Sequence, residues 1–181
     1  MAHAIEIGTP AWADRLRQAD EGRGILRGLK PWTSEQLRWT EQNLNRTLPV
    51  GMGLFLLEFG SGEFGTSGWS IYSSRQFVDA CVGPLWVLTD VPPTASLDEL
   101  RQYYVSRGEG STLQLATATP ELNVLDLVQF GTDGGGGYHL VDVVAHERYY
   151  ELYLSTMTPV ATTFSEWLHH ALQEIDLRFG P

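Results

Sequence analysis

Two glycine-rich motifs are the first candidates for chemistry, because glycine lets a backbone approach a phosphate closely. Residues 60–65, GSGEFG, have the G-x-G-x-x-G spacing of dinucleotide-binding loops. That mechanism needs a strand before the glycines and a helix after them, so that the pyrophosphate meets a helix N-terminus. Here a helix is expected before the motif and a strand after it. The motif therefore predicts the end of a helix and a turn, and we expect no bound cofactor.

The second motif, GTDGGGG at residues 131–137, lies between two apolar runs. It lacks the Lys-Ser/Thr pair of a phosphate-binding P-loop, and a strand is expected after it. A calcium loop would need further spaced carboxylates, and Asp133 is the only one in the segment. Asp and Gly clusters between strands are typical of hairpin turns, which need residues that tolerate positive φ. We expect a turn between antiparallel strands.

Histidines concentrate near the C-terminus and raise the question of a metal site. His139, Asp142 and His146 would be candidate ligands of one ion, but residues 139 and 142 of one strand point to opposite faces. His169 and His170 are adjacent on an expected helix and about 100° apart around it, so they cannot grip one ion. We predict no metal site.

Catalysis without a metal has weak support. No serine lies in a G-x-S-x-G elbow, and Cys81, the only cysteine, has no histidine near it in the sequence. Paired carboxylates, Asp133 with Asp142 or Glu147 with Glu151, could do acid–base work. An acidic surface also produces such pairs by chance. We predict no catalytic residue, and a small carboxylate-dependent hydrolase stays as an alternative.

The elements that would position these residues run from helices to strands and back to a helix. An N-terminal arm, residues 1–30, contains a short helix near 11–19. The capping-box pattern of Thr33 and Gln36 predicts a helix over 33–44, and Pro49 predicts the start of a second that ends before Gly60. Strands are expected at 68–72, 84–90, 122–130, 137–145 and 148–156, and a further helix at 96–108.

The closing segment, TFSEWLHHALQEIDLRFG, predicts an amphipathic helix. Thr163 and Glu166 form a second capping-box pattern. An apolar stripe follows at helical spacing: Phe164, Trp167, Leu168, Ala171, Leu172 and Ile175. The predicted fold class is α+β, a single domain over 31–181 with an N-terminal helix pair, a central and mainly antiparallel sheet, and this C-terminal helix.

The charge is negative and unevenly distributed. The net charge is −10 in 181 residues. Residues 1–48 carry seven basic and six acidic side chains, whereas residues 49–181 carry five basic and sixteen acidic ones. This excess disfavours binding to nucleic acid and favours capture of a basic partner, although acidic surfaces also simply keep proteins soluble.

The cellular location follows from what the sequence lacks. A single cysteine cannot form an intrachain disulfide, which suits a reducing cytoplasm. The first 30 residues contain no continuous apolar run typical of a signal peptide, and the longest apolar run, VGMGLFLLEFG, is too short to cross a bilayer. We expect a cytoplasmic protein that does not bind membranes.

Three stretches resemble the SUKH superfamily of bacterial immunity proteins and a yeast cell-wall-assembly regulator. The first, TSEQLRWTEQNLNRTLPVGMGLFLLEFGSGEFG, is similar to the family's helix, Leu-Pro, second helix and Gly-rich turn. The second, LVQFGTDGGGGYHLVD, is similar to its strand, Phe-Gly-x-Asp-Gly-Gly-Gly turn and next strand, and TTFSEWL matches its closing helix. Residues 1–30 and 73–121 depart from the pattern.

The resemblance implies a non-catalytic bacterial immunity protein that binds and neutralises a cognate toxin, such as a nuclease. A regulatory or scaffold module of the same family is an alternative. Acidic and aromatic residues in or beside the expected turns and strands are the predicted partner-binding set: Glu63, Asp133, Tyr138, Asp142, Glu147, Tyr149, Tyr150 and Glu151.

Overall fold

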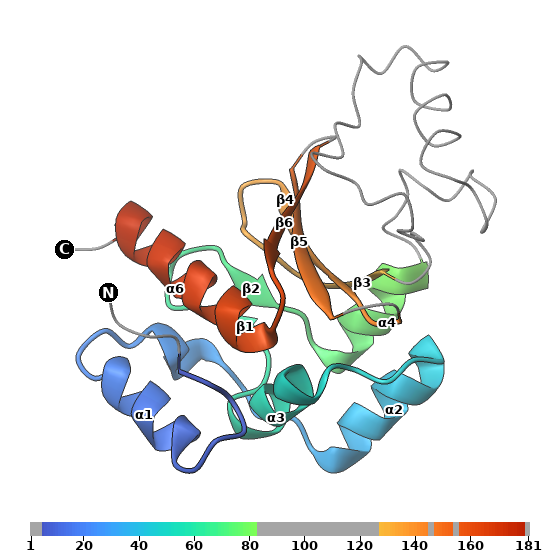
Figure 1. The fold of residues 1–181 in the computed structure, drawn as a ribbon, viewed down its shortest axis with the longest axis horizontal. Coiled ribbons are helices and arrows are strands. Elements are labelled where there is room, and N and C mark those ends of the chain that lie inside the picture. The colour runs from blue at the N-terminus through green and yellow to red at the C-terminus, as the bar shows by residue number, and fades with distance from the viewer. Residues whose placement is uncertain (1–4, 83–126, 145–146, 154–155, 180–181) are drawn as a thin grey trace.

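The computed structural model describes residues 5–82, 127–144, 147–153 and 156–179 (Figure 1). The helices are α1 (Trp12–Ala19), α2 (Ser34–Leu44), α3 (Val50–Glu58), α4 (Ser74–Val82) and α6 (Phe164–Phe179), with a 3-10 turn, η1 (Ile25–Gly28). Three α-helices lead, α4 comes between the second and third strands, and α6 closes the chain, which confirms the predicted single α+β domain with a C-terminal helix.

Six strands form one sheet in the described part of the chain. They are β1 (Gly62–Glu63), β2 (Ser70–Ile71), β3 (Leu127–Thr132), β4 (Gly137–Asp142), β5 (Arg148–Tyr153) and β6 (Thr156–Ala161). Each strand is antiparallel to the next, and their spatial order is the order of the sequence. The sheet is therefore a meander, as expected of a mainly antiparallel sheet.

Two strands and one helix were not predicted from the sequence. β1 has only two residues, and β6 contains Pro159, which argues against an interior strand. β6 lies at an edge of the sheet, where a missing N–H is tolerated. Helix α4 was missed as well, and it packs against α2 and β3. The elements expected at 84–90 and 96–108, and the first residues of the strand expected at 122–130, lie outside the described residues.

The two predicted capping boxes differ in the structure. At α2 the box is complete, because Thr33 Oγ1 accepts from the N–H of Gln36 at 3.1 Å and the Gln36 side chain accepts from the N–H of Thr33 at 2.8 Å. At α6, Thr163 Oγ1 accepts from the N–H of Glu166 at 3.2 Å. The Glu166 carboxylate instead accepts from Thr162, both N–H and hydroxyl. The prediction of a capping box at α6 is therefore only half correct, because Thr163 caps the helix as expected but Glu166 bonds to Thr162 instead of Thr163.

The core lies between α6, α3 and one face of the sheet. The apolar stripe of α6 is buried as predicted except for Leu172, which is partly buried, and Trp167 is fully buried against Phe130 of β3, with ring centroids 4.8 Å apart. Phe55 of α3 contacts Phe164 at the start of α6. Each fully buried side chain of this kind contributes about 1.5–3 kcal/mol, so the layer of α6 on the sheet is a main source of stability.

The N-terminal arm is packed onto this core. Leu16, Ile25 and Leu26 are buried in the same apolar cluster as the later helices. The Asp20 carboxylate accepts from the N–H groups of Ile25 and Leu26, and the N–H of Ile7 donates to the Ser165 hydroxyl on α6. Residues 5–30 are therefore part of one compact unit with the rest of the domain.

The GSGEFG motif ends a helix and begins the sheet, as its context predicts. Gly60 follows α3 with φ +89°, and a Cβ there would lie 1.6 Å from the carbonyl oxygen of Lys30. Ser61 then pairs with Lys30 in an isolated bridge, and β1 follows. The glycine is needed for close packing of two backbone segments.

Candidate functional site

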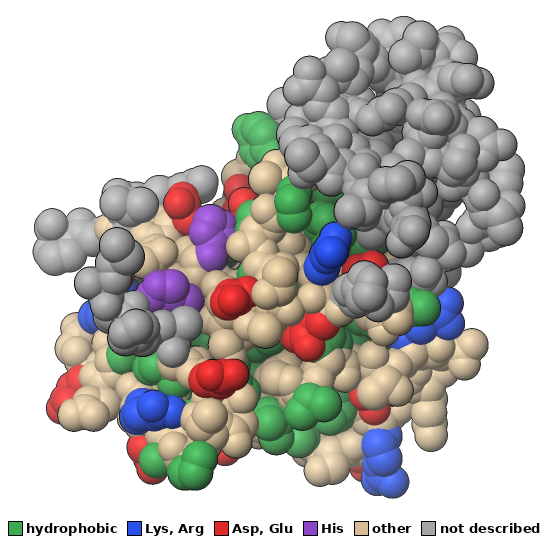
Figure 2. Space-filling model, viewed as in Figure 1, with side chains coloured by type: hydrophobic (Ala, Val, Ile, Leu, Met, Phe, Trp, Pro, Cys, Tyr) green, Lys and Arg blue, Asp and Glu red, His purple; other side chains and the backbone are tan. Residues whose placement is uncertain are grey.

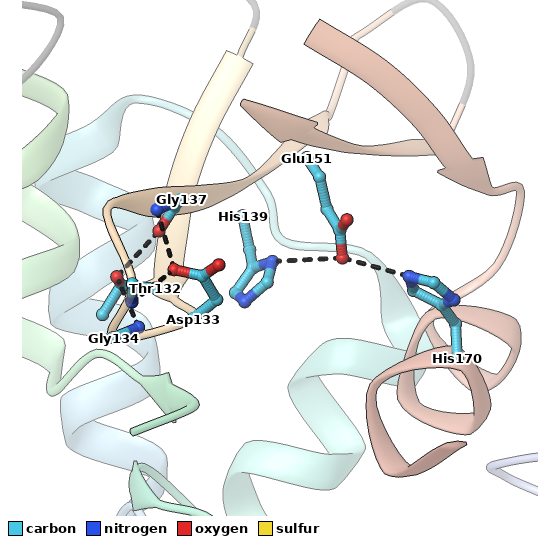
Figure 3. Close-up of polar contacts among 8 residues, drawn as sticks. Thr132, Asp133, Gly134, Gly137, His139, Glu151 and His170 are labelled. Carbon is cyan, nitrogen blue, oxygen red and sulfur yellow. Dashed lines mark hydrogen bonds and ion pairs between the residues drawn. The ribbon is translucent and has the colours of Figure 1, made fainter. Parts of the chain in front are cut away.

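The GTDGGGG segment forms the hairpin turn between β3 and β4. Asp133 Oδ1 accepts from the N–H groups of Gly135 and Gly137, at 2.8 and 2.7 Å (Figure 3). Gly134 has φ +71°, and a Cβ there would lie 2.8 Å from the backbone of Gly68. The glycines are thus explained by positive φ and close contact with the β1–β2 turn, and the predicted hairpin is confirmed.

The β4–β5 ladder places functional side chains on one face of the sheet. Gly137 pairs with Tyr153, and His139 pairs with Glu151. Cross-strand partners point to the same face, so Tyr153, His139 and Glu151 share a face. A Cβ on Gly137 would lie 2.8 Å from the Asp133 carboxyl carbon, so this carboxylate occupies the space above Gly137 on that face.

His139 lies beneath this surface between aromatic rings. Its imidazole stacks on Trp69 with centroids 4.6 Å apart, and Trp167 of α6 meets it edge-on at 5.2 Å. Only 1% of the residue is exposed, and its ring nitrogens make no close hydrogen bond to a side chain of the described residues. Burial lowers the pKa of His139 to about 4, although the charges of Glu151 and Asp133 oppose this. The ring is therefore neutral at physiological pH.

Glu151 lies between two histidines. Its Oε1 is 3.1 Å from Nε2 of His170 on α6 and 3.9 Å from Nδ1 of His139 (Figure 3). The hydrogen bond to Glu151 raises the pKa of His170, against the effect of burial. Burial alone would raise the pKa of Glu151, but His170 and His139 lower it. We call Asp133, His139, Glu151 and His170 the turn-end cluster.

The surface around α6 is open to solvent at this cluster. The side chains of Glu151 and His170 are each about one-third exposed. Figure 2 shows histidine side chains beside carboxylates on this face of the molecule. Glu63 of β1 lies at the β1–β2 turn, where its Oε1 accepts from the N–H of Gly68, and Gly68 in turn packs against Gly134 of the glycine turn.

The structure divides the predicted partner-binding set between several places. Asp133 and Glu151 belong to the turn-end cluster, and Glu63 lies at the adjoining β1–β2 turn. Tyr138 is next to His139 in β4, and side chains alternate along a strand. Tyr138 therefore lies on the opposite face of the sheet from His139. The remaining four, Asp142, Glu147, Tyr149 and Tyr150, lie at the other end of the β4–β5 pair.

Those four residues serve internal contacts. Tyr149 and Tyr150 are 0% and 6% exposed, and burial raises the pKa of both hydroxyls. Asp142 is buried and accepts from the N–H of Val144. Glu147 Oε1 accepts from the Tyr149 hydroxyl at 2.8 Å and from the N–H of Phe164 at 3.2 Å, which ties β5 to the start of α6. Their positions support a role in folding more than in contact with a partner.

Sequence reasoning missed three residues of the site: Trp69, Tyr153 and His170. Tyr153 could have been found from the two-residue period of β5, which puts it on the same face as Glu151, where it is 52% exposed. Trp69 and His170 come from a turn and from α6, and no local pattern relates either of them to Glu151.

The arrangement shows a polar surface over a buried imidazole and gives no sign of a metal centre. Within residues 5–82, 127–144, 147–153 and 156–179, no three His, Cys, Asp or Glu side chains are grouped to hold a metal ion. His139 and Asp142 point to opposite faces of β4, as expected. In the same residues, no helix has the length and apolar character to cross a bilayer.

The fold and the turn-end cluster define a compact α+β domain with an antiparallel meander and an acidic, histidine-containing surface. The SMI1/KNR4 family model (SUKH-1) matches residues 31–170. The chain therefore belongs to the SMI1/KNR4 family, a SUKH family known for immunity-type roles. No curated protein matches this chain.

Proposed function

We propose that this protein is a non-catalytic immunity protein that binds a cognate bacterial toxin and neutralises it. Family membership over residues 31–170 is the observation that carries the proposal. The acidic C-terminal part supports it, because a basic toxin such as a nuclease would be attracted to this surface. The proposed binding site is the acidic surface at the β1–β2 and β3–β4 turns, with Glu63, Asp133 and Glu151.

A direct test is co-expression with the product of a neighbouring toxin-like gene. We expect this chain to restore growth of cells that express the toxin and to co-purify with it at a fixed stoichiometry. A matched chain carrying Trp167→Ala, which should be destabilised by about 3–5 kcal/mol, serves as a control that should rescue growth less well. Growth rescue without any complex would argue against neutralisation by binding.

Salt dependence tests the electrostatic part of the proposal. Raising the salt concentration should reduce the association rate with the toxin more than it raises the dissociation rate. Equal sensitivity of the two rates would contradict steering by the acidic surface. A regulatory or scaffold module of this family would instead bind a partner that has no toxicity, which the same co-expression experiment would reveal.

A further inference from the structure

The surface beside the turn-end cluster combines an exposed aromatic ring with two carboxylates. Tyr153 is 52% exposed and projects on the same face as Glu151, two residues earlier in β5. Asp133 lies across the ladder, above Gly137, which is the register partner of Tyr153. An aromatic face next to carboxylates is the arrangement that binds a flat cation.

In each of the two carboxylates, Glu151 and Asp133, one oxygen accepts no hydrogen bond from the described residues. Glu151 directs Oε1 to both histidines, and Asp133 uses Oδ1 for its two backbone N–H groups. Within the described residues, Oε2 of Glu151 and Oδ2 of Asp133 accept no hydrogen bond. Both groups can therefore take a further donor without giving up the contacts that hold them.

The buried His139 points to the same place. Its ring is 1% exposed, its nitrogens make no close hydrogen bond to a side chain of the described residues, and Nδ1 lies 3.9 Å from Oε1 of Glu151. This distance is too long for a hydrogen bond. A movement of Glu151 toward His139 would shorten this contact, and a hydrogen bond formed there would stabilise the buried ring.

We propose that Glu151, Asp133 and Tyr153 form the seat for an arginine side chain of the toxin. The proposal rests on the proposed function and specifies its contact. The guanidinium lies over the Tyr153 ring and donates to Glu151, while Asp133 adds negative charge. Arginine suits the seat better than lysine, because its planar group can stack and donate two parallel hydrogen bonds at once.

Binding at this seat competes with His170 for Glu151. The charged groups that face Glu151 are His139 from β4, Asp133 from the turn, and His170 of α6, which is itself next to Glu174. When arginine occupies the seat, the Glu151 carboxylate interacts with two cations, the guanidinium and protonated His170. Glu151 then stabilises the protonated His170 less, so the pKa of His170 falls. Binding should therefore release a proton and strengthen as the pH rises through the His170 titration.

The test uses a probe that does not depend on the toxin. The peptide acetyl-Gly-Arg-Gly-amide is titrated into the full chain at low salt, and binding is followed by NMR shifts of the backbone amides. We expect saturable, millimolar binding of the arginine peptide, with shifts centred on Glu151, Tyr153 and His170. The same peptide with lysine in place of arginine should bind more weakly, and the one with glutamine should not bind. Unsaturable shifts spread over all carboxylates would overturn the proposal.

Variants distinguish binding at this seat from unspecific attraction of the peptide to an acidic surface. Glu151→Gln and Tyr153→Leu should each weaken the arginine peptide by about fivefold, the loss of a contact of about 1 kcal/mol. Tyr153→Phe keeps the ring and should retain most of the affinity. Glu35→Gln, on α2 and away from the cluster, should change nothing. Equal loss in Glu35→Gln and Glu151→Gln would refute a specific seat.

His170 provides the readout that a structural role would not produce. The arginine peptide should lower the pKa of His170, and His170→Gln should abolish the pH dependence of peptide binding. A pKa of His170 that does not move on saturation would contradict the competition. If the peptide binds but no toxin does, the proposed function fails and the seat stands; if the toxin binds equally well to Glu151→Gln and Tyr153→Leu, the seat fails and the function stands.

Discussion

The indole of Trp69 and the imidazole of His139 stack with centroids 4.6 Å apart and 28° between their planes. Trp69 follows the β1–β2 turn, and His139 lies in β4, so the contact joins the edge of the sheet to its centre. The stacking removes His139 from water, and Nδ1 of the ring lies 3.9 Å from Oε1 of Glu151, too far for a hydrogen bond. The first prediction follows from this burial.

His139 should make the protein less stable in acid. Its pKa is about 4 in the folded chain and 6.5 when unfolded, so the unfolded state binds the proton first as the pH falls. Stability should be lost between about pH 6.5 and 4, by up to about 3 kcal/mol from this group. His139→Phe, which keeps a flat ring, should flatten the curve in that window. Parallel curves from urea melts of the two proteins would contradict the prediction.

Trp167→Ala should lower the free energy of unfolding by about 3–5 kcal/mol. The ring is fully buried among Phe130, Phe164 and His139, so its removal leaves a cavity under α6. Val50→Ala is the matched control, since Val50 is 77% exposed and should change stability by less than about 0.5 kcal/mol. A loss below about 1 kcal/mol for Trp167→Ala in a denaturant melt would show that the stripe of α6 is not core.

Glu147 and Tyr149 should be energetically coupled. Glu147→Ala leaves the buried hydroxyl of Tyr149 and the N–H of Phe164 without their acceptor, at a cost of about 1–3 kcal/mol. In the Tyr149→Phe background the same change should cost less, because one of the two donors is already gone. A double-mutant cycle measures the difference. Additive losses would mean that the hydroxyl contact contributes nothing.

The glycines of the hairpin should differ in their tolerance of alanine. Gly134→Ala combines a positive φ with a Cβ 2.8 Å from Gly68, so it should destabilise the protein by at least about 1–2 kcal/mol. Gly135→Ala has an ordinary φ and its nearest neighbour at 3.6 Å, so it should have little effect. Thermal melts of the two variants check this order, and equal melting temperatures would contradict it.

Nucleotides and divalent metals should leave the melting temperature unchanged. GSGEFG ends a helix and GTDGGGG turns between strands, so neither motif has the surroundings that phosphate binding requires. A ligand at 100 times its dissociation constant would add about 2.7 kcal/mol, which a thermal shift assay would detect. A clear shift with ATP, NAD or Mg²⁺ would overturn the structural interpretation of one of these motifs.

The sequence by itself determined most of the local structure. Periodicity predicted α2, α3 and α6, because each repeats apolar residues at helical spacing and carries a start or stop signal. The Asp-Gly cluster predicted the β3–β4 hairpin, because these residues tolerate the positive φ that a tight turn between strands needs. β6 was not predicted, because Pro159 argues against a strand in its sequence. Pairing with β5 outweighs this local preference in the folded chain.

Tertiary structure alone decided which residues form the site. Glu151, His170 and Trp69 come from a strand, a helix and a turn, and only the packing of α6 across the sheet brings them together. The tyrosines of β5 show the same limit: Tyr149, which was predicted, and Tyr153, which was not, share one face of the strand, yet the first is fully buried and the second is half exposed. Alternation assigns a residue to a face of the sheet, but the position of the covering helix decides whether that residue is core or surface.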